Sequence, residues 1–357
     1  MADKERALIA MSGGVDSSIA AYLMQREGYE CRGAMMKLYK PDCPKAVFNT
    51  DEEDAKAVAD RVGIPFDLLD FEEDFKKKII EKFIRVYEEG GTPNPCVDCN
   101  RYIKFSKMLE FAAEKGCNYI VTGHYARIEK DPDSGRYILK KAVDLTKDQS
   151  YVLYNLTQEE LAHIKLPLGE MTKEEARKLA EENGFVNAHK KDSQDICFVP
   201  DGDYVSFIES YKGKSYEEGN FIDKDGNIIG RHRGAIHYTK GQRKGLGIAA
   251  GHPIYVSSKN MKENTVTVGE EEDIFTDSCI VEDLNWIAFD ELKSELRCKV
   301  KLRYRQIEKD CTLYPQGDGR VKVLLDEAQR AITAGQAAVF YDGENVIGGG
   351  TIIEESL

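Results

Sequence analysis

The first 200 residues alternate short apolar runs with longer segments that carry apolar residues at helical spacing. Residues 7–11 and 119–121 are continuous apolar runs, as in parallel strands that are buried on both faces. Residues 17–27 and 106–115 have apolar positions three and four residues apart, which predicts helices. This alternation predicts a doubly wound α/β domain, in which helices cover both faces of a parallel sheet.

The pattern changes after about residue 200, where turn residues become frequent and the strand candidates become short. Residues 295–306 alternate polar and apolar side chains, and residues 337–353 do so around a hairpin turn at Asp342-Gly343. Such closely spaced strands predict a small C-terminal β-barrel, with a small mostly-β domain before it. We therefore expect three domains, at residues 1–200, 201–272 and 273–357.

Composition and charge limit the environment and the partners of the chain. Its 357 residues are 41% apolar and 32% charged, and no apolar stretch approaches the ~20 residues that span a bilayer. The chain begins without an apolar signal segment, so we expect a cytoplasmic protein with no membrane contact. The net charge of -13 argues against a non-specific nucleic-acid coat, so any nucleic acid must meet a local basic patch.

A glycine-containing loop lies between the first predicted strand and the first predicted helix, with the sequence SGGVDSS at residues 12–18. Gly13 and Gly14 permit a tight turn whose N–H groups face an anion, and the helix N-terminus favours phosphate. No Walker lysine follows, so the loop suits a site that binds pyrophosphate as a unit. Asp16 is a candidate Mg²⁺ ligand. A plain strand–helix turn with a serine cap is the simpler alternative.

Three of the nine cysteines call for an explanation beyond burial as reduced thiols. Cys96 and Cys99 form a Cys-x-x-Cys pair beside Pro93 and Pro95, so we expect a stiff loop that holds its side chains outward. Cys197 follows a polar run. Reactive cysteines need a low pKa and an accessible sulfur.

The loop at residues 12–18 resembles the PP-loop of ATP pyrophosphatases, which adenylate an oxygen atom and release pyrophosphate. Further motifs occur in the order seen in the tRNA-specific 2-thiouridylase family, and the resemblance covers essentially the whole chain. These motifs are TPNPCVDCN (92–100), TGHYAR (122–127), KDQSYVLY (147–154), KDSQDICF (191–198), GQRKGLGI (241–248), KLRYRQ (301–306) and GQAAVFYDGENVIGGG (335–350).

The resemblance implies ATP-dependent 2-thiolation of the wobble uridine of tRNA, with ATP and Mg²⁺ as cofactors. ATP would adenylate the C2 oxygen, and a persulfide sulfur carried by Cys197 would attack C2, with release of AMP and pyrophosphate. Cys99 would resolve the transfer through a Cys99–Cys197 disulfide. The implied partners are tRNAs with Lys, Glu or Gln acceptors and, as sulfur donor, a sulfur-relay protein or cysteine desulfurase.

The resemblance also assigns residues to three groups of contacts. For ATP they are Ala10, Met11, Ser12, Gly13, Gly14, Val15, Asp16, Ser17, Met36 and Gly123. For the target base they are Asn94, Pro95 and Cys96, and for the rest of the tRNA they are His124, Asp148, Gln149, Ser150, Arg303, Tyr304 and Gln336. Simpler alternatives are a core position for Met36, a local hydrogen bond for His124 and a helix-cap cluster at residues 148–150.

Other chemistry stays open at this point. Some members of the family carry Asp where this chain has Cys96, so Cys96, Cys99 and Cys197 form a candidate ligand set for a labile [4Fe–4S] cluster or for zinc. A persulfide is the preferred hypothesis. A PP-loop amide ligase or a non-enzymatic ATP- or RNA-binding module would leave the paired thiols without a task.

Two basic segments are candidates for tRNA contact. Residues 231–244 hold five Lys or Arg, two His and no acidic residue. Alternate positions from 297 to 305 place five cations on one face of the strand predicted at 295–306, which suits a phosphate backbone. A solvated strand face is the alternative.

Overall fold

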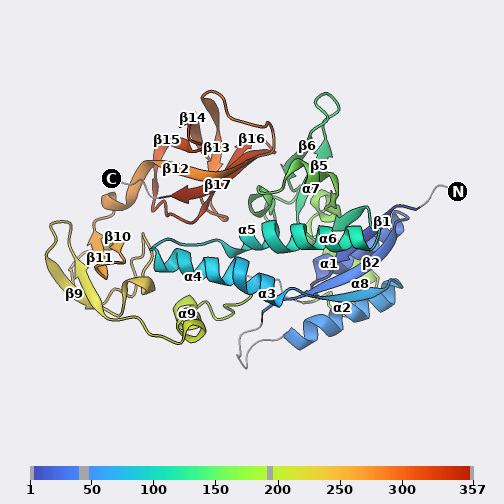
Figure 1. Ribbon diagram of the computed structural model, residues 1–357, viewed down its shortest axis with the longest axis horizontal. Coiled ribbons are helices and arrows are strands. Elements are labelled where there is room, and N and C mark those ends of the chain that lie inside the picture. Colours follow the sequence, from blue (N-terminus) through green and yellow to red (C-terminus); the bar gives the residue numbers. More distant parts are fainter. Residues whose placement is uncertain (1–3, 40–47, 191–195, 354–357) are drawn as a thin grey trace.

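The computed structural model describes residues 4–39, 48–190 and 196–353, so residues 191–195 of the KDSQDICF motif lie outside the described part. The first domain is built on a five-stranded parallel sheet (Figure 1). Its strand order is β3 (Phe66–Asp70), β2 (Glu30–Lys37), β1 (Arg6–Ala10), β4 (Tyr119–Val121) and β7 (Ile164–Lys165).

Helices bury both faces of this sheet, because side chains alternate in direction along β1. Ala7 and Ile9 pack in a cluster with α1 (Val15–Arg26), α2 (Phe48–Val62) and α8 (Lys173–Glu182). Leu8 packs on the other side with α6 (Ser106–Glu114). The doubly wound α/β prediction is confirmed.

The Cys-x-x-Cys motif lies in a helix, so the expectation of an outward-facing loop is wrong. Helix α5 (Pro95–Cys99) passes through a π-helical turn at residues 100–105 into α6, and Figure 1 shows α5 and α6 in one line. Pro95 stands in the first turn, where a missing N–H breaks no helical hydrogen bond. A second helical run lies beside it in Figure 1, from α3 (Glu72–Phe75) through a π turn to α4 (Glu81–Glu88).

A small β domain follows helix α9 (Tyr204–Lys212). Its sheet has the order β10 (Tyr255–Asn260), β11 (Thr265–Gly269), β8 (Gly219–Ile222) and β9 (Ile228–His232). Phe221 and Val266 are fully buried in its core with Val256. Most of the loop at residues 239–254 lacks regular structure, as its turn residues indicate.

The C-terminal strands close into a six-stranded barrel because β12 pairs with both β15 and β17. The strands are β12 (Phe275–Trp286), β15 (Val321–Arg330), β14 (Lys309–Pro315), β13 (Leu296–Lys301), β16 (Ala337–Asp342) and β17 (Asn345–Ile353), in spatial order. Gly348 and Gly349 allow the closure, since a Cβ on Gly348 would lie 2.4 Å from the Asn285 carbonyl oxygen. The predicted barrel and its β16–β17 hairpin are confirmed.

The barrel is joined to the first domain by a hairpin that the sequence pattern did not reveal. Strands β5 (Ala126–Lys130) and β6 (Tyr137–Lys141) extend the barrel sheet, with Lys140 opposite Asn345 of β17. Helix α7 (Gln158–Ala162) follows this hairpin. Within the described ranges, no helix has both the length and the apolar character needed to cross a membrane.

Candidate active site

The glycine loop between β1 and α1 is shaped for an anion. Gly13 has φ +72°, and a Cβ there would lie 2.3 Å from the Asp51 carbonyl oxygen, so no other residue fits. Helix α1 begins after Gly14 without a side-chain cap. The Ser17 hydroxyl donates to the Gly14 carbonyl at 3.0 Å. The uncapped N–H groups of the first turn therefore suit a phosphate, which is where the resemblance places ATP.

Two side chains from beyond α8 hold the outer side of this loop. The Asn187 amide donates to the Gly13 carbonyl at 3.0 Å and to the Ser18 hydroxyl at 2.9 Å. The Lys190 ammonium contacts the same carbonyl at 3.2 Å and the carboxylates of Asp51 and Asp54 at 2.6 Å. Neither residue was predicted, because their role depends on a tertiary contact between distant parts of the sequence.

Asp16 is held by a buried ammonium. Both carboxylate oxygens accept from Lys173, at 2.7 and 2.8 Å, and one also accepts from the Tyr125 hydroxyl at 2.9 Å. Gly123 makes room for this arrangement, since a Cβ there would lie 2.8 Å from the Cβ of Asp16. A Mg²⁺ ion at Asp16 would have to share these oxygens with Lys173, so the metal role of Asp16 stays a prediction.

The remaining predicted ATP residues lie at or near the carboxyl edge of the sheet. Ala10 ends β1, Met36 lies near the end of β2, and Gly123 follows β4. Met36 is partly buried and packs against two apolar clusters, so its core role and a place beside a nucleotide are compatible. Open parallel sheets bind ligands at this edge.

The three cysteines of interest gather at one place, although Cys197 is almost 100 residues from the pair. Cys96 and Cys99 are one helical turn apart on α5, and Cys99 packs in an apolar cluster with Phe198. Burial raises the pKa of the Cys99 thiol to about 12, with smaller contributions from Cys197 and Cys96. Burial also raises the pKa of Cys197 to about 11, and nearby Cys96 adds to this.

One lysine opposes these shifts. Lys104 lies in the π-helical turn after Cys99, and its positive charge lowers the pKa of Cys96, Cys99 and Cys197 against the effect of burial. Cys96 and Cys197 are exposed, although the protein around each sulfur still disfavours its charged form. Lys104 was missed because the motif alone does not show that a π-helical turn brings this side chain back to the thiols.

His124 is buried beside the same lysine. Its Nδ1 is 2.7 Å from the Thr122 hydroxyl, and its ring centroid is 5.8 Å from that of Phe105. Burial and then Lys104 lower the pKa of His124, so the ring is neutral near pH 7. The structure thus has the local hydrogen bond of the simpler interpretation, and contact with tRNA stays a prediction.

The barrel contributes the far wall of the site. The Tyr304 ring lies 5.8 Å from the ring of Tyr151, whose hydroxyl donates to the Ala337 carbonyl at 2.9 Å. Burial raises the pKa of Tyr304, and the nearby charges of Asp148 and Cys96 raise it further. Because Tyr304 is partly exposed and near Cys96, a base presented to the cysteines would meet an aromatic surface.

The cluster at residues 148–150 has a structural role. Asp148 is buried and accepts from the Ala142 and Ser150 N–H groups and from the Ser150 hydroxyl. The Gln149 side chain accepts from the Tyr125 N–H at 2.9 Å. Asp148 therefore binds the first N–H of the 3₁₀ turn Ser150–Leu153, while the N-cap residue Gln149 makes no side-chain cap hydrogen bond, so the cap-cluster interpretation accounts for part of the motif. A tRNA contact by these three residues stays a prediction.

The expectation of five cations on one strand face is wrong. Strand β13 ends at Lys301, and Arg297, Lys299 and Lys301 pair with Asp326, Asp310 and Glu308. Arg303 and Tyr304 lie in the exposed loop that follows, where the Arg303 guanidinium donates to the Ala331 carbonyl. These carboxylates come from β14, from β15 and from the loop before β14, and the alternation of residues within one strand does not show such partners.

The fold and the glycine loop define a PP-loop protein of the nucleotide-binding α/β class. Residues 5–201 match the family model "tRNA methyl transferase HUP domain", residues 205–270 its PRC-barrel domain, and residues 276–352 an aminomethyltransferase beta-barrel domain. The chain belongs to the tRNA-specific 2-thiouridylase family.

Curated relatives match over the full length. The chain is 48% identical to a tRNA-specific 2-thiouridylase of Clostridioides difficile, with 99% of both chains covered. It is also 48% identical to one from Acetivibrio thermocellus, over 98% of this chain and 99% of that one. A U34-tRNA thiolase of Methanococcus maripaludis with a [4Fe-4S] cluster is 16% identical, with a TM-score of 0.36 over 58% of this chain and 67% of that chain.

Replacing Lys104 should make the cysteines less reactive. Alkylation requires the thiolate, and the pKa of Cys197 is about 11. Below that pH, the alkylation rate of Cys197 should therefore rise about tenfold for each unit of pH. Lys104→Met removes the charge that lowers this pKa, and we expect alkylation at pH 8 to slow about three- to tenfold. Peptide-resolved mass spectrometry after timed iodoacetamide treatment measures the rates. Lys104→Arg should retain them, and equal rates in wild type and Lys104→Met would contradict the assignment.

Proposed function

We propose that the protein is an ATP-dependent tRNA-uridine 2-sulfurtransferase that thiolates C2 of the wobble uridine. The observation that carries the proposal is the approach of Cys99 and Cys197, from distant parts of the chain, in a cluster that packs against Met36 near the carboxyl edge of the sheet. The names of the full-length relatives support the same chemistry. An amide ligase would need neither thiol.

The first step would activate the uridine. The C2 oxygen attacks the α-phosphate of ATP, the bond to the β-phosphate breaks, and pyrophosphate leaves. Backbone N–H groups at the start of α1 would bind the phosphates, and Asn187 would keep the Gly13 carbonyl turned away from them. Mg²⁺ would neutralise phosphate charge. The Lys173 ammonium next to Asp16 neutralises the charge of this carboxylate.

The second step would transfer sulfur. The terminal sulfur of a Cys197 persulfide attacks C2 and AMP leaves with the C2 oxygen. The Cys99 thiolate then attacks Sγ of Cys197, which forms a Cys99–Cys197 disulfide and leaves the outer sulfur on C2. A thiol reductant returns both cysteines to the reduced state. The charge of Lys104 would favour the thiolate that each attack requires.

We favour a persulfide over a cluster, although Cys96, Cys99 and Cys197 lie near one another. In the part of the chain that the structure describes, no three His, Cys, Asp or Glu side chains are grouped so that they could hold a metal ion. We therefore assign Cys96 to the target-base contact with Asn94 and Pro95, where it lines the site next to Tyr304. Iron analysis of anaerobically purified protein tests the choice, and stoichiometric iron would favour the cluster.

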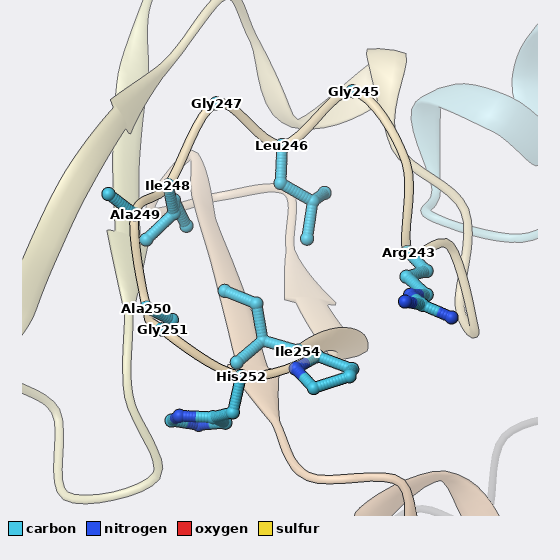
Figure 2. A pocket seen from close by; sticks show the side chains of 11 residues that line it. Arg243, Gly245, Leu246, Gly247, Ile248, Ala249, Ala250, Gly251, His252 and Ile254 are labelled. Carbon is cyan, nitrogen blue, oxygen red and sulfur yellow. The ribbon is translucent and has the colours of Figure 1, made fainter.

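The tRNA would cover the middle domain and the barrel. Arg330 of β15 donates to the Gly241 carbonyl at 2.8 Å. Burial lowers the pKa of Arg303, and the nearby charge of Arg330 lowers it further. Gly241 lies shortly before the 243–254 loop, which lines an open surface pocket of about 470 Å³. Figure 2 shows Leu246 directed into this loop and Arg243 at one side of it. We propose that the middle domain spans residues 201–272 and that the barrel domain follows from residue 273.

The substrates and donors follow from the same family assignment. We propose tRNAs with Lys, Glu and Gln acceptors as substrates, with a sulfur-relay protein or cysteine desulfurase as donor. Met36 and Gly123 would contact the nucleotide, while His124, Asp148, Gln149, Ser150, Arg303 and Tyr304 would contact or support the bound tRNA.

Replacing Cys197 should separate the two steps. In Cys197→Ser we expect tRNA-dependent release of pyrophosphate to persist, because the anion loop is intact, while 2-thiouridine falls by at least about 100-fold. Mass spectrometry of nucleosides and a pyrophosphate assay measure both. Cys117→Ser, at a half-buried cysteine outside the cluster, is the matched control. Thiolation at the wild-type rate in Cys197→Ser would refute the proposal.

Reversing the charge of the loop after β13 should weaken tRNA binding. For Arg303→Glu with Arg305→Glu we expect tRNA affinity to fall about tenfold or more at low salt, because two attractive charges become repulsive. ATP affinity should change little. Arg320→Glu with Lys322→Glu, at the opposite end of β14, makes the same change in net charge away from this loop. Unchanged tRNA affinity in a filter-binding titration would count against this docking surface.

A further inference from the structure

The segment that leads into α5 is held by contacts with other elements, one of which is a hydrogen bond between the Asn94 side chain and the buried Tyr151. Residues 92–95 read Thr-Pro-Asn-Pro, and the two prolines have no N–H to donate. Asn94 precedes the helix without a side-chain hydrogen bond to cap it. Yet this segment sets where Cys96 and Cys99 lie.

The barrel supplies the missing donors. The Gln336 side-chain amide donates to the Thr92 carbonyl at 2.9 Å and to the Pro93 carbonyl at 3.3 Å. The Thr92 N–H in turn donates to the Ala334 carbonyl at 2.8 Å. The Gln336 backbone is itself fixed, because its carbonyl accepts from the Ile352 N–H of β17 at 2.8 Å.

The contact is close-packed on both sides. A Cβ on Gly335, which has φ +86°, would lie 2.6 Å from Cγ1 of Val86 and 3.1 Å from the Thr92 carbonyl oxygen. A Cβ on Gly91 would lie 2.9 Å from the Ala334 carbonyl oxygen. Two glycines that face each other at this distance permit a backbone-to-backbone approach that side chains would prevent.

We propose that Gln336 is a positioning residue, whose amide fixes the segment before α5 and thereby the placement of Cys96 and Cys99. The resemblance assigns Gln336 to tRNA contact, whereas the geometry commits its amide N–H groups to the protein backbone. This inference rests on the proposed function in one respect, namely that Cys96 and Cys99 lie where the reaction takes place.

The expected effect follows from the geometry. Without the amide, two carbonyl groups lose their donor and the segment can shift, which moves the start of α5. A displacement of about 1 Å between reacting groups lowers a rate by about 100-fold. A tRNA contact would instead affect binding, with no effect on the saturated rate.

The test uses Gln336→Leu, which removes both donors at similar size. The matched control is Gln329→Leu, because the Gln329 amide likewise donates to two backbone carbonyls, those of Glu327 and Ala328, within β15. We expect the single-turnover thiolation rate at saturating tRNA to fall about 10- to 100-fold in Gln336→Leu only. The dissociation constant for tRNA should stay within about threefold.

A second readout does not depend on thiolation. The alkylation rates of Cys96 and Cys99, resolved by peptide, should change at least about threefold in Gln336→Leu and not in Gln329→Leu. Gln336→Asn, which keeps the amide on a shorter arm, serves if Gln336→Leu does not fold, and should show the same changes. Weakened tRNA binding with a wild-type saturated rate and wild-type alkylation would overturn the proposal. Altered alkylation in a protein that never thiolates tRNA would support the positioning role and refute the proposed function alone.

Discussion

The site depends on one positive charge that lies near cysteine sulfurs whose thiolate form the surrounding protein disfavours. A thiolate is strongly disfavoured when it is buried, and burial raises the pKa of Cys99 to about 12 and that of Cys197 to about 11. One ammonium, that of Lys104, opposes this effect at both sulfurs and at Cys96. The π-helical turn after Cys99 places this lysine, so the helix distortion and the thiol chemistry are linked.

The two functional halves of the site are held by different parts of the protein. The anion loop is fixed within the first domain, by Asn187 and Lys190 on one side and by Lys173 through Asp16 on the other. The cysteine helix is fixed from the barrel. Arg101, just after Cys99, forms an ion pair with Asp283 of β12, while Gln336 binds the segment before the helix. Relative movement of the barrel would therefore move the thiols against the nucleotide loop.

Much of this arrangement was predictable from the sequence, and the exceptions have physical reasons. Apolar runs and helical spacing predicted the α/β domain, and alternating residues between turns predicted the barrel. Both patterns arise because the buried faces of helices and strands carry apolar residues at regular intervals. The prolines around Cys96 indicated a loop, but Pro95 occupies a first helical turn, where it is tolerated. The alternation of residues predicted a cationic strand face at Arg297, but this arginine pairs with Asp326 of β15, two strands away. Asn187 and Gln336 act through tertiary contacts, which a local pattern does not encode, and Lys104 depends on a π-helical turn that the motif does not indicate.

The central claim is that Cys99 and Cys197 react with each other once per sulfur transferred. The most direct measurement is peptide mass spectrometry under non-reducing conditions, after one turnover with persulfide-loaded protein, ATP, Mg²⁺ and tRNA in the absence of reductant. One Cys99–Cys197 disulfide should form for each 2-thiouridine. Formation of 2-thiouridine with both thiols still reduced, or with a disulfide that omits Cys197, would contradict the claim.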